Sequence, residues 1–206
     1  MGRYDEAISN YEKASSLLRF TNNKSEQYRS INNIGQVLLE KGDIESALEK
    51  FEKSLEIFES LTKEEFPFKS SIINNIGVCY YQKGNIQEAI KYYEKALEIS
   101  LHTFGDTNHH LIAIRYNNLG NAYGSLKQNK KAIEYIKKAI EIDLKEFDEN
   151  HPQIGRYYYN LGANYSLLGL DELAKKHLKH SYEILKEKML ESDPIITRLK
   201  KELNII

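Results

Sequence analysis

Pairs of adjacent asparagines recur along this chain and could supply a row of hydrogen-bonding groups. Each pair stands directly before an apolar residue and a glycine. The pairs are Asn32-Asn33, Asn74-Asn75 and Asn117-Asn118, with Asn160 alone in the fourth place. An asparagine amide both donates and accepts hydrogen bonds, so it can pair with a peptide backbone whatever side chains that peptide carries. The pattern predicts either contacts to a ligand or ties between neighbouring helices.

Histidines and one cysteine are the other residues that could do chemistry. His177 and His180 lie three residues apart, near enough to share a helix face, but the sequence places no third metal ligand beside them. A solvated helix face is the expected position for both. Cys79 lies beside Tyr80 at a position that we expect to be apolar and buried, and burial would keep its thiol inert. With no phosphate-binding loop or nucleophile motif, we predict no enzyme activity, no cofactor and no metal.

A repeated helical unit must position these residues. Four glycines, Gly35, Gly77, Gly120 and Gly162, lie 42, 43 and 42 residues apart. Small residues return twelve positions after each glycine and bulky ones sixteen positions after it, with apolar residues between them at spacings of three and four. A fixed period of this length predicts stacked pairs of antiparallel helices, an all-α solenoid, rather than a single closed core.

Proline and aspartate mark where the first helix of each unit begins. A column made of Pro67, His110, Pro152 and Pro194 has the same period, and proline is best tolerated in the first turn of a helix. Asp193 is a suitable amino-terminal cap. A last, solitary helix is therefore expected over residues 193–203.

Glycines mark the turn inside each unit. Gly42, Gly84 and Gly169 fall seven residues after the repeat glycine, where the chain must reverse and left-handed dihedral angles are needed. Lys127 breaks this column. We expect the nearby Asn129 to supply that turn instead.

The predicted organisation is one domain over residues 1–206. It contains a leading half-repeat at 2–20, repeats at about 24–62, 66–102, 108–146 and 151–190, and the capping helix. The chain begins half a repeat in, which predicts either a fragment of a longer protein or an uncapped first helix that meets a partner. Self-association through that helix is a further prediction.

Composition limits the classes of partner. Lys plus Arg (29) nearly cancels Asp plus Glu (30), whereas a nucleic-acid binder normally carries a basic excess. No apolar run approaches the length of a membrane helix, and we expect no membrane partner. A single cysteine and the lack of an apolar amino-terminal segment favour a cytoplasmic location.

The column pattern resembles the tetratricopeptide repeat (TPR), here about eight residues longer than the usual 34. The joins at 104–110 and 147–152 are similar to those of the long repeats in kinesin light chains. This resemblance implies a right-handed superhelix of about four full repeats whose first helices line a concave groove. It also implies a protein-binding scaffold, or alternatively the peptide-sensing regulatory domain of a larger signalling protein.

Ligand contacts in such repeats come from fixed positions of the first helices. Carried onto this sequence, the resemblance implies a peptide-binding set: Asn33, Asn75, Asn118, Asn160, Asn32, Asn74, Asn117, Tyr159, Arg29, Arg156, Gln36, Val78, Tyr81 and Asn121. Arg115 would add positive charge beside Arg29 and Arg156. Together with Tyr81 and Tyr159, these residues predict a preference for acidic peptides with aromatic or aliphatic side chains.

Overall fold

The computed structural model describes residues 4, 6, 8–11, 13, 24–61, 67–105 and 109–205. Within these residues every regular element is a helix, which confirms the predicted all-α class. Internal contacts divide the chain into two compact units, residues 1–105 and 106–206. One continuous domain therefore stays a prediction.

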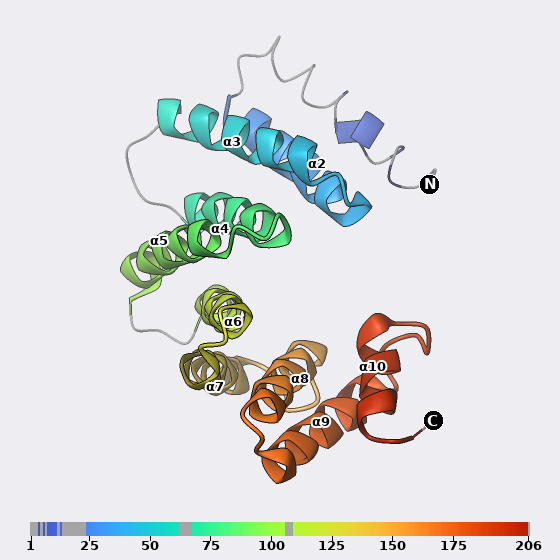
Figure 1. Cartoon of the computed structure of the whole chain (residues 1–206). Coiled ribbons are helices and arrows are strands. Elements are labelled where there is room, and N and C mark those ends of the chain that lie inside the picture. The colour runs from blue at the N-terminus through green and yellow to red at the C-terminus, as the bar shows by residue number, and fades with distance from the viewer. Residues whose placement is uncertain are drawn as a thin grey trace. The chain divides into compact units, whose positions relative to one another are not determined.

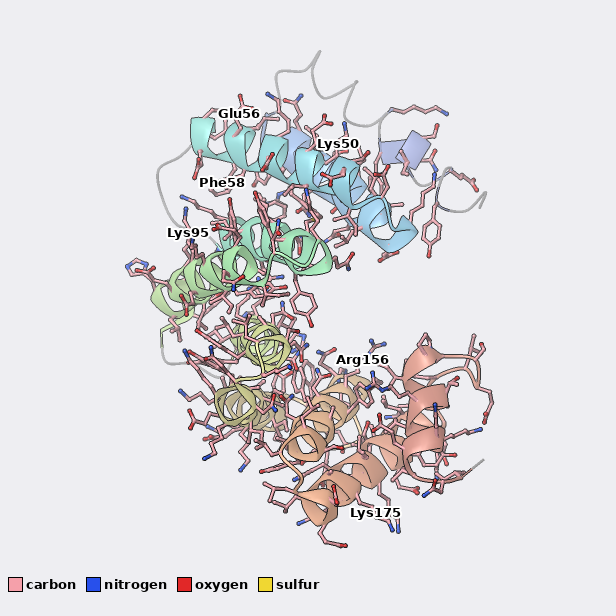
Figure 2. The ribbon with its side chains drawn as sticks, viewed as in Figure 1. Lys50, Glu56, Phe58, Lys95, Arg156 and Lys175 are labelled. Atoms are coloured by element: carbon pink, nitrogen blue, oxygen red, sulfur yellow. The ribbon has the colours of Figure 1, made fainter. Side chains whose placement is uncertain are left out.

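The described residues of the first unit include two helical hairpins (Figure 1). They are formed by α2 (Lys24–Lys41) with α3 (Ile44–Leu61) and by α4 (Pro67–Gln82) with α5 (Ile86–Phe104). The hairpins stack through α3 and α4. Phe58, which is 3% exposed, points from α3 toward α4 and meets the Tyr28 ring edge-on (Figure 2).

The predicted half-repeat at 2–20 lies mostly outside the described residues. Those that are described include a helical stretch at 8–11. Ile8 and Tyr11 pack against the core of the first unit, and the Ser30 hydroxyl donates a 2.9 Å hydrogen bond to the Tyr11 carbonyl.

The second unit continues the same pattern with two hairpins and a short last helix. The helices are α6 (His110–Ser125), α7 (Asn129–Glu146), α8 (Pro152–Leu167), α9 (Asp171–Leu185) and α10 (Pro194–Glu202). Neighbouring hairpins meet through α7 and α8, and α10 packs on α9. The expected helix starts are confirmed, because α4, α6, α8 and α10 each begin at the predicted residue. The Asp193 side chain caps α10 by accepting a 2.8 Å hydrogen bond from the Ile195 amide.

The turn at Lys127 differs from the prediction. Lys127 itself adopts the left-handed conformation, with φ 59°, as Gly42 does with φ 88°. Its amide donates to the Gly124 carbonyl, the bond that Gly42 makes to Leu39. Asn129 does not supply the turn and is instead the buried first residue of α7. The closing hydrogen bonds of the hairpin impose this conformation on whatever residue stands there.

Close packing of paired helices requires the repeat glycines. A β-carbon on Gly120 would lie 2.6 Å from Ile136 Cγ1 and 3.1 Å from the Ala132 carbonyl oxygen. Buried hydroxyls add a second tie within some hairpins, since Ser54 and Ser181 each donate a 2.7 Å bond to a carbonyl of the first helix. Both features hold the first helices in register, which places the asparagine pairs.

Candidate functional site

The asparagine pairs form hydrogen bonds between successive first helices. Asn75 Nδ2 lies 3.3 Å from Asn32 Oδ1, which joins α4 to α2. In the second unit Asn160 Nδ2 lies 3.0 Å from Asn117 Oδ1, which joins α8 to α6. In each case the asparagine at the second position of the pair, which Asn160 fills alone in the fourth repeat, donates to the asparagine at the first position in the preceding repeat. The amides therefore tie neighbouring helices, as one of the two sequence interpretations predicts.

The two members of each pair differ in exposure. The first members are buried, with Asn32, Asn74 and Asn117 only 3%, 6% and 8% exposed. The second members, Asn33, Asn75, Asn118 and Asn160, are half-buried. Each tie uses one hydrogen of the amide of Asn75 or Asn160, while an asparagine side chain carries a second N–H and a carbonyl oxygen.

The remaining predicted positions are accessible to different degrees. Arg29, Gln36 and Arg156 are exposed, and the others are half-buried: Val78, Tyr81, Asn121 and Tyr159. Arg156 leaves α8 on the side away from Lys175 of α9 (Figure 2). The guanidinium carbon of Arg29 lies over the rings of Tyr28 and Phe68, 5.9 and 5.6 Å from their centroids.

Arg115 does not add charge to this face. It is 2% exposed, and burial lowers the pKa of its guanidinium to about 10. The prediction was wrong because Arg115 stands one position beyond Ile114, which occupies a predicted ligand position, and one residue rotates a helix by about 100°. The other members of its own column include Ile72 and Tyr157, which are fully buried.

Arg198 on α10 is a residue that the sequence interpretation missed. It lies 42 residues after Arg156 in the same column. Its guanidinium is 5.9 Å from the Tyr159 ring centroid, and its Nε is 2.9 Å from Glu202 Oε1. Extending the repeat period into the capping helix would have found it.

A buried polar cluster in the second unit was also missed. Asp143 is fully buried, and its Oδ2 accepts a 3.0 Å hydrogen bond from the Tyr157 hydroxyl and lies 2.9 Å from His110 Nδ1. Burial and the Asp143 carboxylate raise the pKa of Tyr157 well above its usual range. The other repeats place Phe58, Ser100 and Leu185 in the column of Asp143, so the cluster belongs to one repeat only.

His177 and His180 both lie against aromatic rings of α8, but the His180 side chain is still 38% exposed and lies 3.4 Å from the exposed Glu149. The His177 ring is stacked between Tyr158 and Tyr165, with centroids 5.7 and 5.4 Å away. Burial, and then the neighbouring Lys176, lower the pKa of His177. His180 meets the edge of Tyr158. Across the described part of the chain, no group of three His, Cys, Asp or Glu side chains is placed to hold a metal ion.

Cys79 is confirmed as a buried residue. It is 0% exposed, and burial raises the pKa of its thiol to about 11. Among the described residues no helix is both long and apolar enough to cross a bilayer.

The chain belongs to the tetratricopeptide repeat family. One model of this repeat matches residues 1–60, 69–145 and 111–187, and a second matches residues 34–100. These matches confirm the resemblance drawn from the glycine, alanine and bulky columns. Proteins built from this repeat generally mediate protein–protein interactions and are generally non-catalytic scaffolds.

Solved structures support the same fold. BtubC (BKLC) from P. vanneervenii is 19% identical, with a TM-score of 0.80 over 98% of this chain and 82% of that one. A putative kinesin light chain from Podosopora anserina, with nearly identical TPR-like repeats, is 20% identical, with a TM-score of 0.68 over 92% and 90%. A chain from the APC/C hetero-tetramer Cut9-Hcn1 is 24% identical, with a TM-score of 0.71 over 96% and 33%.

These neighbours confirm the α-solenoid of helix pairs and the likeness to kinesin light chain repeats. At these identities the likeness shows the fold alone. A comparison with curated proteins found no significant match.

Proposed function

We propose that this chain is a non-catalytic scaffold whose first helices bind a peptide or an extended partner segment. The observation that carries the proposal is the repeated partial exposure of Asn33, Asn75, Asn118 and Asn160, whereas Asn32, Asn74 and Asn117 are buried. Asn75 and Asn160 are each held by one hydrogen bond to the preceding repeat, which fixes the side chain without using all its hydrogen-bonding atoms. A pre-oriented amide costs little entropy when it pairs with a ligand backbone.

Arginine side chains on α8 and α10 indicate which class of peptide this surface would bind. Arg156 is exposed, Arg198 stands in the equivalent place on α10, and Tyr159 adds half-buried aromatic surface. Guanidinium groups bind carboxylates with directed, charge-assisted hydrogen bonds. An extended peptide with acidic and aromatic side chains is therefore the ligand we propose for the second unit.

We also propose that this protein is cytoplasmic. A buried, unpaired cysteine suits a reducing cytoplasm, where thiols stay free. Self-association through the predicted half-repeat at 2–20 stays a prediction, since most of that segment lies outside the described residues.

The test is a selection of binders from a random peptide library on the full 206-residue chain, followed by affinity measurements. The double variant Asn75→Ala, Asn160→Ala removes two of the half-buried amides, and we expect affinity to fall roughly tenfold or more. The matched control is Asn32→Ala, Asn117→Ala, which removes the acceptors of the same two ties but leaves the amides of Asn75 and Asn160 in place.

The control separates ligand contact from helix tying. Affinity that survives in the control and is lost in the Asn75→Ala, Asn160→Ala variant supports the proposal. Equal losses in both variants would mean that the amides act only through the ties, and a library that yields no binder would contradict the proposal outright.

A further inference from the structure

A hollow opens beside the aromatic rings of the last hairpin. It has a volume of about 410 Å³ and is lined by the rings of Tyr158, His177 and His180. Four exposed, charged side chains complete the lining: Glu149, Lys176, Lys179 and Glu183. Small-molecule sites have volumes in this range and combine aromatic walls with a few polar groups.

The three rings form one aromatic wall of the hollow. The planes of the Tyr158 and His177 rings are nearly parallel, with an angle of 10° between them and 5.7 Å between the centroids. His180 meets Tyr158 edge-on, with the centroids 4.3 Å apart. All three side chains are half-buried, so part of each ring stays open to the hollow. Such a wall can stack against another flat aromatic group.

The first three repeats carry a lysine at the place of His180. These lysines are Lys53, Lys95 and Lys138. In the third repeat Lys138 Nζ lies over the rings of Tyr116 and Tyr135, 5.5 and 5.8 Å from their centroids, and these two rings stand at the positions equivalent to the parallel pair of the wall. The chain's own ammonium group therefore covers the rings of the third repeat, whereas the last repeat has no lysine at this position.

The charges of the lining leave two cations available. Glu149 lies 3.4 Å from His180 Nε2, and Glu183 forms an ion pair with Lys186. The two lysines of the lining are exposed, and in the described part of the chain neither lies within ion-pair distance of a carboxylate. A lysine ammonium group forms charge-assisted hydrogen bonds with a bound carboxylate.

The surroundings of His177 also favour an anion. Burial lowers the pKa of His177, and the ammonium groups of Lys176 and Lys137 lower it further. Because this pKa lies below the ordinary 6.5, the ring is mainly neutral at pH 7 and presents an uncharged flat surface. A bound anion would offset the positive charge of the lysines, whereas a bound cation would add to it.

We propose that this hollow binds a small planar aromatic molecule that carries a carboxylate. The flat part would stack on the wall beside Tyr158 and His177, and the carboxylate would pair with Lys176 or Lys179. The residues of this site are separate from the asparagine positions of the first helices. The site is therefore a second binding function, and it does not depend on the proposed peptide scaffold.

The test is a titration of the full 206-residue chain with 2-naphthoate, followed by nuclear magnetic resonance of the His177 and His180 ring protons. This probe has two fused aromatic rings and one carboxylate. We expect both histidine signals to shift along one saturable curve. Two comparison probes should bind at least roughly tenfold more weakly: 2-naphthylmethylammonium, with the same rings and the opposite charge, and cyclohexanecarboxylate, with no aromatic ring.

Variants that copy earlier repeats separate the charges from the ring. Lys176→Glu, Lys179→Glu installs the residues found at these places in the third and second repeats, and Tyr158→Ile installs that of the second. Each should keep the helical circular dichroism signal and bind 2-naphthoate at least roughly tenfold more weakly. The control Lys130→Glu, Lys175→Glu makes the same change of net charge at exposed lysines outside the hollow, and its affinity should be unchanged.

Several results would overturn the proposal. One is the absence of a saturable shift at both histidines. Another is equal affinity for 2-naphthoate and for either comparison probe, because the wall or the lysines would then contribute nothing. A lysine variant that binds as tightly as the parent, or a control that loses affinity equally, would also contradict the site.

Discussion

Asn160 donates its side-chain amide hydrogen to Asn117 Oδ1 across 3.0 Å, and the same columns in the first unit make the same bond between Asn75 and Asn32 at 3.3 Å. In both cases the partners are 43 residues apart. A single hydrogen bond thus repeats with the period of the fold and holds successive first helices at a fixed rotation. The hydrogen bond also fixes the direction of the half-buried Asn75 and Asn160 side chains.

The tie should contribute measurably to stability. In Asn160→Ala the buried acceptor Asn117 Oδ1, on a residue 8% exposed, loses its donor, and we expect the free energy of unfolding to fall by about 1 kcal/mol. Urea denaturation followed by circular dichroism measures this loss. Asn85→Ala is the control, because Asn85 is exposed and its side chain makes no cap hydrogen bond. Equal stability of the two variants would show that the tie carries no net free energy.

Replacing Lys127, which has a left-handed backbone conformation, by glycine should stabilise the protein. With φ at 59°, Lys127→Gly relieves the clash of the β-carbon, and we expect a gain of about 0.5–1 kcal/mol. The reciprocal variant Gly84→Lys, at φ 80°, should lose a similar amount. Thermal melts of both variants check the pair. A loss of stability in Lys127→Gly would mean that the lysine side chain makes contacts that outweigh its strained backbone.

The repeat glycine should not tolerate a methyl group. In Gly120→Ala the new β-carbon would meet Ile136 at 2.6 Å and a backbone oxygen at 3.1 Å, and we expect destabilisation by about 1–3 kcal/mol. Denaturant unfolding gives the value. Combining the change with Ile136→Ala, which removes the clashing Cγ1, should cost less than the sum of the two single losses, because the nearest contact is a side-chain carbon. A fully stable Gly120→Ala protein would contradict the close approach of α6 and α7.

The stacked histidine predicts a pH dependence of stability. The pKa of His177 is lowered from its ordinary 6.5, so the unfolded chain takes up the proton more readily than the folded chain does. Stability that is present above pH 6.5 is then lost as the pH falls. His177→Tyr, which copies Tyr135 at the same place in the preceding repeat, should flatten the curve between about pH 7 and 5. The control His102→Gln changes an exposed histidine and should leave the curve as it is.

The helices could be predicted well from the sequence because the same spacing of residues recurs in four successive units. The helix starts at Pro67 and Pro194 follow from that column alone. Single-repeat departures could not be predicted in this way. Whether Arg115 lies in the core or on the surface depends on one helical step, and Lys127 adopts a conformation that its residue type disfavours.

The candidate site was predicted in part for a related reason. The asparagine columns are visible in the sequence, but only coordinates separate the buried first members from the half-buried second members. The pairing of Asn75 with Asn32 links residues of different repeats, and no local pattern specifies which atom donates. The sequence predicted that His177 lies on a solvated face. Its ring instead stacks on two tyrosines of the other helix of the hairpin, and the spacing within its own helix could not reveal them.

The most direct test of the proposed binding face is nuclear magnetic resonance of the asparagine side-chain NH2 groups during titration with a selected peptide. The account predicts that the signals of Asn75 and Asn160 shift with the saturation curve of binding, while that of Asn85, at the turn before α5, stays in place. If the peptide binds and neither Asn75 nor Asn160 responds, the first-helix amides do not contact the ligand, and the proposed function is contradicted.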